Sequence, residues 1–356
     1  MTENKEFLKK LLALPGLSGF EDPIREVIAE TWRPLADELS VSRIGSLQAL
    51  KKGTADAPRP SILLSGHMDA IGLIVTQVVD GFIRFTEIGG IDPRILPGQP
   101  VTVHGRRDLP ARVVMPPAWL LPAGYGPRDA VAMKYLLIDT GLLPEETAAL
   151  VQVGDVVSFA QEPLELSDDA LAGHSLDDRA AVVSITACLQ ELQHVRHEWD
   201  VWAVASVQEE ETLGGAFTSP FSIRPQIAVA IDVTFAKGPG GPSDYRTFPL
   251  GKGITLGWGP NIHPKIFNTF KDLAERLDIP YQIEVMPRHS GTDAMGLQVV
   301  AEGIPTMVIG IPLRYMHTPV ELVSMKDIAR AGHLMAEMIA NLKADFVEKI
   351  RWEDEK

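Results

Sequence analysis

Segments with apolar residues at helical spacing alternate along this chain with short apolar runs typical of strands. This alternation predicts an α/β fold. Near the N-terminal end, Phe7, Leu8, Leu11, Leu12 and Leu14 form the stripe of one helix. Further on, short apolar runs typical of buried parallel strands alternate with segments of helical spacing. The predicted helices cover about 24–32, 182–192, 266–277 and 328–346, and the predicted strands cover 61–65, 201–207, 227–231, 281–285 and 305–311.

Three acidic positions carry signals for helix starts. Asp22 followed by Pro23 predicts an N-cap with proline at the first helical position. Ser324 with Asp327 predicts a capping box for the closing helix. Asp293 is interpreted either as a cap for a helix starting at Ala294 or, within its Gly-Thr-Asp segment, as part of a pocket lining.

The pattern of apolar and polar residues differs between about Ile71 and Phe159 from that of the rest of the chain. Short alternating runs such as 82–85 and 101–103 are separated by prolines and glycines, and long helical stripes are scarce. This pattern is typical of a small β-domain. We therefore predict an α/β domain formed by 1–70 and 166–356, interrupted by an inserted β-domain at 71–165.

Composition narrows the class of protein. The 356 residues include 33 basic and 47 acidic ones, and the net charge of −14 disfavours nucleic acid as a partner. Cys188 is the single cysteine, which excludes an intrachain disulfide and favours a reducing compartment. The first residues lack the pattern of a signal peptide, and no uncharged apolar stretch reaches the roughly 18 residues that a membrane span needs. We expect a cytoplasmic protein without a membrane partner.

Acidic residues and histidines follow several of the predicted strands. Ligands in open α/β sheets collect beyond the carboxyl ends of strands, so these residues are candidates for one site. Burying an ionised carboxylate costs several kcal/mol unless a cation or dense hydrogen bonding compensates it. Mixed nitrogen and oxygen donors suit a pair of divalent metals such as zinc, cobalt or manganese. The candidates are His67 with Asp69, Asp177 with Asp178, Glu209 with Glu210, Asp232, and His317.

Six short segments, in this order along the chain, resemble the tetrahedral aminopeptidases, the glutamyl and leucyl aminopeptidase family of the dinuclear-metal clan MH peptidases. They are Ser65-Gly66-His67-Met68-Asp69, Leu176-Asp177-Asp178-Arg179, Gln208-Glu209-Glu210, Ala230-Ile231-Asp232-Val233-Thr234, Gly291-Thr292-Asp293-Ala294 and Met316-His317-Thr318-Pro319. The resemblance spans nearly the whole chain and implies a mixed central sheet flanked by helices. The chain departs from the family's usual pattern at Ala70, over 211–215 and at His174.

The resemblance also implies the ligands of two divalent ions, with zinc expected and cobalt or manganese as alternatives. Asp177 would bridge both ions. His67 and Asp232 would complete one site, and Glu210 and His317 would complete the other.

Two further roles are implied by the resemblance. Glu209 would be the general base on a water that bridges the two metals, and Asp69 would fix the tautomer of the His67 imidazole. The peptide bond between Asp177 and Asp178 would be cis. Glu211, the third acid of its run, is interpreted as a solvated or supporting carboxylate.

The function implied by the resemblance is a metal-dependent aminopeptidase that removes N-terminal residues from peptides. The inserted β-domain would serve substrate access and the assembly of dimers into a dodecamer. Two enzymatic alternatives are a deacylase on the same metal scaffold and an endoglucanase-type glycosidase, since relatives are sometimes labelled endoglucanases. A metal-stabilised assembly protein without catalysis is the non-enzymatic alternative.

Overall fold

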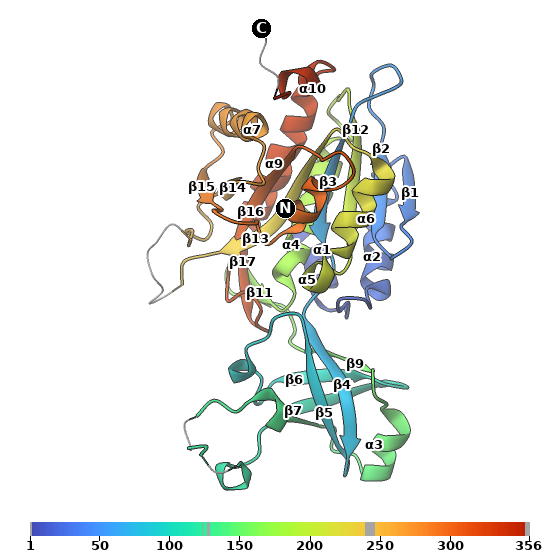
Figure 1. The fold of residues 1–356 in the computed structure, drawn as a ribbon, viewed down its shortest axis with the longest axis vertical. Helices are drawn as coiled ribbons and strands as arrows, with labels where there is room; N and C mark the ends of the chain where they lie inside the picture. Colours follow the sequence, from blue (N-terminus) through green and yellow to red (C-terminus); the bar gives the residue numbers. More distant parts are fainter. Residues whose placement is uncertain (1, 123, 127–128, 239–245, 353–356) are drawn as a thin grey trace.

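A mixed sheet covered by helices forms one unit of the chain, and a small closed β-barrel forms the other (Figure 1). The computed structural model describes residues 2–122, 124–126, 129–238 and 246–352. The chain leaves the sheet after His67, builds the barrel, and returns to the sheet near residue 164. The predicted α/β fold with an inserted β-domain is confirmed, whereas the boundaries at 70/71 and 165/166 stay a prediction.

Four parallel strands form the middle of the large sheet and are almost wholly buried. In spatial order the sheet contains β1 (Glu38–Val41), β2 (Leu47–Lys51), β12 (Asp200–Ser206), β3 (Ser61–His67), β13 (Ile227–Phe235), β16 (Thr306–Arg314), β17 (Glu321–Ser324), β11 (Ala170–Gly173) and β10 (Leu164–Glu165). A branch adds β14 (Ile254–Trp258), which pairs with β16, and β15 (Tyr281–Val285), which pairs with β14. Since β12, β3, β13 and β16 run parallel, their carboxyl ends share one edge of the sheet.

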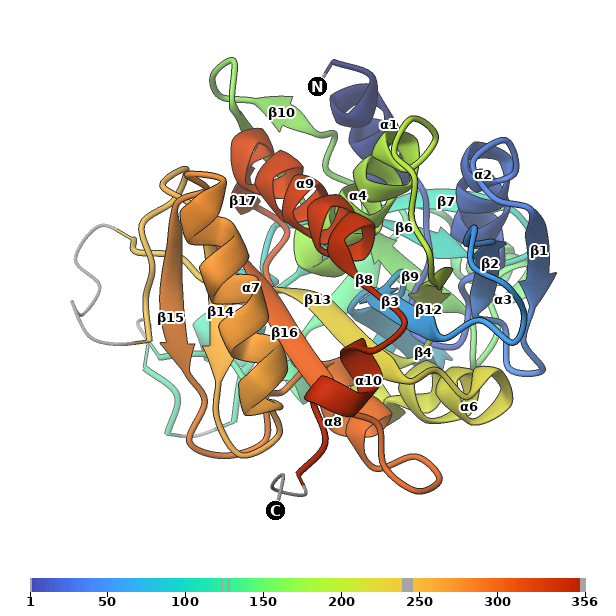
Figure 2. The ribbon, with the colours of Figure 1, turned by 90° about the horizontal axis from the view of Figure 1, so that it is seen from above.

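Helices pack on both faces of the sheet. A Cβ at Gly66 would lie 2.8 Å from the Ala181 Cβ of α4, while the neighbouring Ser65 hydroxyl donates to Asp293 of α8 on the other face. Figure 2 shows α4 and α9 lying next to each other on one face of the sheet. The helices are α1 (Thr2–Leu12), α2 (Asp22–Trp32), α3 (Pro144–Leu150), α4 (Leu176–Glu191), α5 (Glu209–Thr212), α6 (Gly214–Ile223), α7 (Pro264–Arg276), α8 (Asp293–Gln298), α9 (Met325–Asn341) and α10 (Phe346–Lys349).

The barrel closes around its own apolar core, which includes Leu73, Ile83, Val103 and Val113. Along Asp108–Val114 exposed and buried positions alternate, as expected for a strand with one face on the core. In order around the barrel they are β4 (Gly72–Val79), β5 (Phe82–Ile88), β8 (Leu137–Asp139), β7 (Asp108–Val114), β6 (Pro100–His104) and β9 (Val156–Phe159). Short 3-10 turns occupy Pro93–Ile95, Ala118–Leu120 and Met133–Tyr135.

The predicted helix caps differ from the observed ones. Ser324 precedes α9 but makes no capping bond, and the Asp327 carboxylate instead accepts the N–H groups of Gly251 and Gly253, so the predicted capping box is wrong. Asp22 lies inside α2 and pairs with Arg25 rather than capping the helix.

The described ranges contain no helix that is both long and apolar enough to cross a membrane.

Candidate active site

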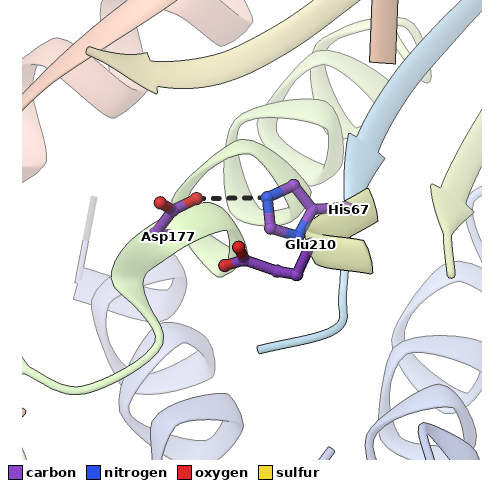
Figure 3. Close-up of side chains that lie close together, drawn as sticks. All are labelled: His67, Asp177 and Glu210. Carbon is purple, nitrogen blue, oxygen red and sulfur yellow. Dashed lines mark hydrogen bonds and ion pairs between the residues drawn. The ribbon is translucent and has the colours of Figure 1, made fainter. Parts of the chain in front are cut away.

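Residues from three separated segments meet at the carboxyl edge of the parallel strands (Figure 3). His67 ends β3, Asp177 begins α4, and Glu210 follows β12 on the short α5. The His67 Nε2 atom lies 3.1 Å from Asp177 Oδ1, and one donor atom from each of the three residues falls within 4.8 Å of the others. An imidazole and two carboxylates at this spacing can hold a divalent cation.

His317 joins this cluster from the loop between β16 and β17. Its Nε2 atom lies 3.4 Å from Asp177 Oδ2 and 3.4 Å from Glu210 Oε2. The two oxygens of the Asp177 carboxylate therefore face different imidazoles, that of His67 and that of His317. This is the arrangement that a carboxylate bridging two cations requires.

Asp232 and Asp178 form a second group around the same His67 imidazole. Donor atoms of the three residues lie within 4.8 Å of one another, and all three side chains are buried. Asp178 was a candidate residue for this site, but the resemblance did not assign it as a metal ligand. Its Oδ1 atom also accepts the Ala181 N–H inside α4, and its peptide bond to Asp177 is cis, in agreement with the resemblance.

Backbone carbonyl groups fix the orientation of both imidazoles. The Nδ1 atom of His67 lies 3.1 Å from the Asp69 carbonyl, and the Nδ1 atom of His317 lies 2.8 Å from the Gly90 carbonyl. A carbonyl only accepts, so Nδ1 carries the proton in each ring. In a neutral ring this leaves the lone pair on Nε2, facing the cluster of carboxylates.

A left-handed residue places both glutamates in the site. Neighbouring residues of a continued strand would point to opposite faces of the sheet. Gln208 has a φ of 60°, which ends the extended segment and starts the turn α5. Glu209 and Glu210 consequently line the same cavity, and Glu209 Oε2 lies 3.9 Å from His67 Nε2.

The buried carboxylate of Asp69 holds the turn that carries these glutamates. Its Oδ1 atom accepts the Glu209 N–H at 3.0 Å, and its Oδ2 atom accepts the Glu210 N–H at 3.3 Å. Asp69 Oδ1 also lies 3.5 Å from His67 Nδ1. The side chain that was predicted to orient an imidazole thus also positions the glutamate pair.

The crowding of buried acids shifts their pKa values in a direction that favours bound cations. Burial raises the pKa of Glu209 and of Glu210 to about 8, with added repulsion from Asp177 in both cases. Burial also raises the pKa of Asp232, with further repulsion from Asp178. Asp177 is different: burial raises its pKa, but hydrogen bonds from His317 and His67 outweigh burial and lower it. Replacing the protons of such a cluster by divalent cations relieves this repulsion, so the donor set fits a metal site.

Glu321 holds the backbone of two residues of the cluster. The sequence-based interpretation did not include it among the site residues. It is buried at the start of β17, where Oε2 accepts the Asp177 N–H at 3.1 Å and Oε1 accepts the His317 N–H at 2.9 Å. One side chain therefore fixes the backbone of two candidate ligands. A glutamate four positions after the histidine is too common a pattern to reveal this role in a sequence.

Asp293 is neither the predicted helix cap nor a lining residue of the cavity. Thr292 caps α8 by accepting the Ala294 N–H, and Asp293 is the first residue of that helix. One of its oxygens accepts hydrogen bonds from the Ser65 and Ser206 hydroxyls at 2.6 and 2.5 Å. It therefore ties β3 to β12 just below the cluster, while Gly291 and Thr292 line the cavity itself.

The barrel contacts the site through the segment Gly89-Gly90. The Gly89 N–H donates to Glu211 at 2.6 Å, and the Gly90 carbonyl accepts from His317. The Glu211 carboxylate is thus exposed to solvent, as one interpretation predicts, and also hydrogen-bonded to the insert. His174, another departure from the family pattern, is buried against the Ser175 hydroxyl, and burial with the nearby Arg179 charge lowers its pKa to about 3.

A cavity of about 320 Å³ opens over the cluster and leads along the sheet toward β15. The model of the M42 glutamyl aminopeptidase family matches residues 45–334 of this chain, a range that includes the whole cluster. The chain belongs to this family. Because this is a family of aminopeptidases, the M42 chain is a hydrolase of the aminopeptidase class.

Relatives of this M42 aminopeptidase resemble it over nearly their full length. A lysyl aminopeptidase of Pyrococcus furiosus is 35% identical over 346 residues, which cover 95% of this chain and 97% of the relative. A TET aminopeptidase from the marine sediment archaeon Thaumarchaeota archaeon SCGC AB-539-E09 superimposes with a TM-score of 0.92 at 29% identity, covering 98% and 99% of the two chains. The TET1 peptidase of Pyrococcus horikoshii, described as assembling into a tetrahedron or a large octahedral shell, gives a TM-score of 0.82 at 28% identity and 95% and 100% coverage.

Proposed function

We propose that this chain is a dinuclear metallo-aminopeptidase that hydrolyses the first peptide bond of its substrates. The observation that carries the proposal is the meeting of two imidazoles and several buried carboxylates around Asp177, whose two oxygens face His67 and His317. The ligands of one ion are His67, Asp177 and Asp232, with Asp178 close enough to contribute. Zinc is the expected metal, because it accepts such mixed nitrogen and oxygen ligands, as do cobalt and manganese.

Glu210 and His317 share the Asp177 carboxylate as ligands of the other ion. This assignment leaves Glu209 without a ligand role, although its carboxylate lines the same cavity. A carboxylate next to the ligands that binds no ion is suited to acid–base work.

Glu209 moves the proton during peptide hydrolysis. The chemistry that bound divalent ions supply at such a site is polarisation of the scissile carbonyl and a lower pKa of the attacking water. Glu209 accepts a proton from this water while the water oxygen forms a bond to the carbonyl carbon. The same carboxyl then donates the proton to the leaving nitrogen when the C–N bond breaks, and Asp69 holds the Glu209 backbone in place throughout.

A substrate panel tests the proposal against its alternatives. The purified protein is reconstituted with zinc, cobalt or manganese and assayed on amino acid p-nitroanilides, N-acetylated amino acids and soluble cellulose. Metal-dependent release of p-nitroaniline is the expected result. Release of acetate alone would support the deacylase, and chelator-resistant release of reducing sugar would support the glycosidase, whose two carboxyls act without a metal. Metal binding without hydrolysis of any substrate would support the assembly protein.

Glu321→Gln is expected to weaken metal binding by about 10- to 100-fold, the usual effect of losing a residue that orients ligands. The amide replaces one acceptor oxygen by a donor, which then faces the N–H of Asp177 or His317. Competition with a chromogenic chelator measures the affinity. Glu302→Gln is the matched control, because Glu302 is exposed and pairs with Arg224 on the surface. Equal affinities in the two variants would contradict this role of Glu321.

The proposal includes self-association through the inserted barrel into dimers and a dodecamer. The solved relative that forms a tetrahedron supports it, as do the exposed side chains of Trp119 and Leu120 on the insert, since exposed apolar groups are typical of contact surfaces. Native mass spectrometry is expected to detect twelve chains of 38.8 kDa, about 466 kDa together. A single species of 38.8 kDa at micromolar concentration would contradict the assembly.

A further inference from the structure

The cavity over the cluster continues to a second acidic residue that the mechanism does not use. Glu284 lies on β15, outside the segments of the candidate metal ligands, and lines the same cavity as Asp232 and Glu209. Its Oε1 atom accepts the Thr234 hydroxyl at 2.7 Å, and its Oε2 atom accepts the Thr255 hydroxyl at 2.6 Å. Two hydroxyls on different strands thus hold the carboxylate in one position.

The spacing of residues along β13 separates the Glu284 end of the cavity from the cluster. Thr234 follows Asp232 by two positions on β13, so both side chains lie on the same face of the sheet, about 6.6 Å apart along the strand. The Glu284 carboxylate accepts the Thr234 hydroxyl and so lies at this second position rather than at Asp232. The four-carbon stem of a lysine is of the length needed to cross this interval.

Gly310 makes room for the acidic end of the cavity. It pairs with Asp232 on one side and with Thr255 on the other. A Cβ at this position would lie 2.2 Å from the Thr255 hydroxyl and 3.0 Å from Glu284 Oε2. Any larger residue would displace the hydroxyl that holds the Glu284 carboxylate.

The walls between the cluster and Glu284 are largely apolar. They include Met286, Val308, Met316 and Phe235. A ligand that fills this part of the cavity would place hydrocarbon against these side chains and a polar head at Glu284. Lysine and arginine side chains have this distribution of apolar stem and charged head.

Among the described residues, hydroxyl groups rather than a lysine or arginine hold the Glu284 carboxylate. Burial raises the pKa of its carboxyl, and the Thr255 and Thr234 hydroxyls are the groups that oppose this shift. Within the ranges that the structure describes, no lysine or arginine forms an ion pair with it. A half-buried carboxylate held in this way favours a cationic ligand and disfavours an anionic one.

We propose that Glu284 selects substrates whose N-terminal residue is lysine or arginine. The inference rests on the proposed aminopeptidase function and names its substrate class. The α-amino end and the scissile bond lie at the cluster, and the cationic head of the first side chain pairs with the Glu284 carboxylate.

Kinetics on neutral and charged side chains of equal length test the charge pairing. With metal-loaded enzyme, kcat/KM is measured for lysyl, arginyl, norleucyl, leucyl and glutamyl p-nitroanilides. The kcat/KM of the lysyl substrate is expected to exceed that of the norleucyl substrate by about 30-fold or more, because a desolvated charge pair typically has an effect of this size. In Glu284→Gln the lysyl and norleucyl values of kcat/KM become similar. The leucyl value stays within about threefold of the wild type, since an apolar side chain loses no charge pair. Glu302→Gln, on the surface, keeps the ratio.

Equilibrium binding separates the two levels of the proposal. Calorimetry on the metal-loaded protein compares free lysine with norleucine, in the wild type and in Glu284→Gln. Glu284→Met, apolar and of similar length, replaces the glutamine variant if the latter does not fold. If the wild type binds lysine more tightly than norleucine, Glu284→Gln does not, and neither protein hydrolyses any substrate, the aminopeptidase function is wrong. The assignment of Glu284 as the residue that binds the cationic head is then still supported. Turnover with equal ratios in the wild type and the variant would overturn the assignment.

Discussion

Replacing Glu209 by glutamine is expected to lower kcat by about 10²- to 10⁴-fold, the range typical of losing a general base. The amide has nearly the same shape but cannot accept the proton of the attacking water. Its backbone N–H can still donate to Asp69, so the turn α5 and the neighbouring Glu210 keep their positions. Stopped assays on the best p-nitroanilide substrate of the wild type measure the change.

Metal content and thermal stability serve as the controls for this variant. Glu209→Gln is expected to bind as much metal as the wild type, because Glu210 rather than Glu209 belongs to the candidate ligand group. Glu302→Gln on the surface is the matched variant and keeps the wild-type rate. A Glu209→Gln enzyme with full activity would rule out the assigned base, and one with reduced metal content would make Glu209 a ligand.

Removal of the metals is expected to abolish hydrolysis and to lower the stability of the protein. The acids around Asp177 are buried and repel one another, so ions that bind only the folded chain stabilise it. One ion at about 100 times its dissociation constant contributes about 2.7 kcal/mol. The wild type is dialysed against a chelator, its metal content is measured, and activity and thermal unfolding are followed before and after zinc is restored.

The control for this experiment is the chelated protein given back a stoichiometric amount of metal. Recovery of both rate and melting temperature is expected, which separates loss of the ions from irreversible unfolding. Hydrolysis at the full rate by protein that contains no metal would contradict the proposed mechanism. Loss of activity without any change in unfolding would show that the ions contribute little to the stability of the fold.

Several features of the site could be predicted because they depend on local pattern. His67, Asp177, Glu210, Asp232 and His317 each lie at or near the end of an apolar run, or at a helix start, and such positions converge in a parallel sheet. The α/β fold with its inserted β-domain followed from the change in the pattern of apolar and polar residues near Ile71 for the same reason.

Other features depend on which strands become neighbours. The Asp327 carboxylate caps no helix because tertiary packing brings the N–H groups of Gly251 and Gly253 to it. The contacts of Glu321 with the backbone of Asp177 span 144 residues of sequence. No local pattern encodes partners at this separation, so propensity and spacing pointed to the wrong cap and missed this glutamate.

The sequence by itself determined which donors gather at the carboxyl edge, because strand ends are set by the hydrophobic pattern. Only the tertiary structure decided how those donors are held and what lies beside them. The two hydroxyls on Glu284 come from β13 and β14, and the space for them comes from Gly310 on β16 between these strands. Strand order and register fix these neighbours, and both result from packing between residues far apart in the chain.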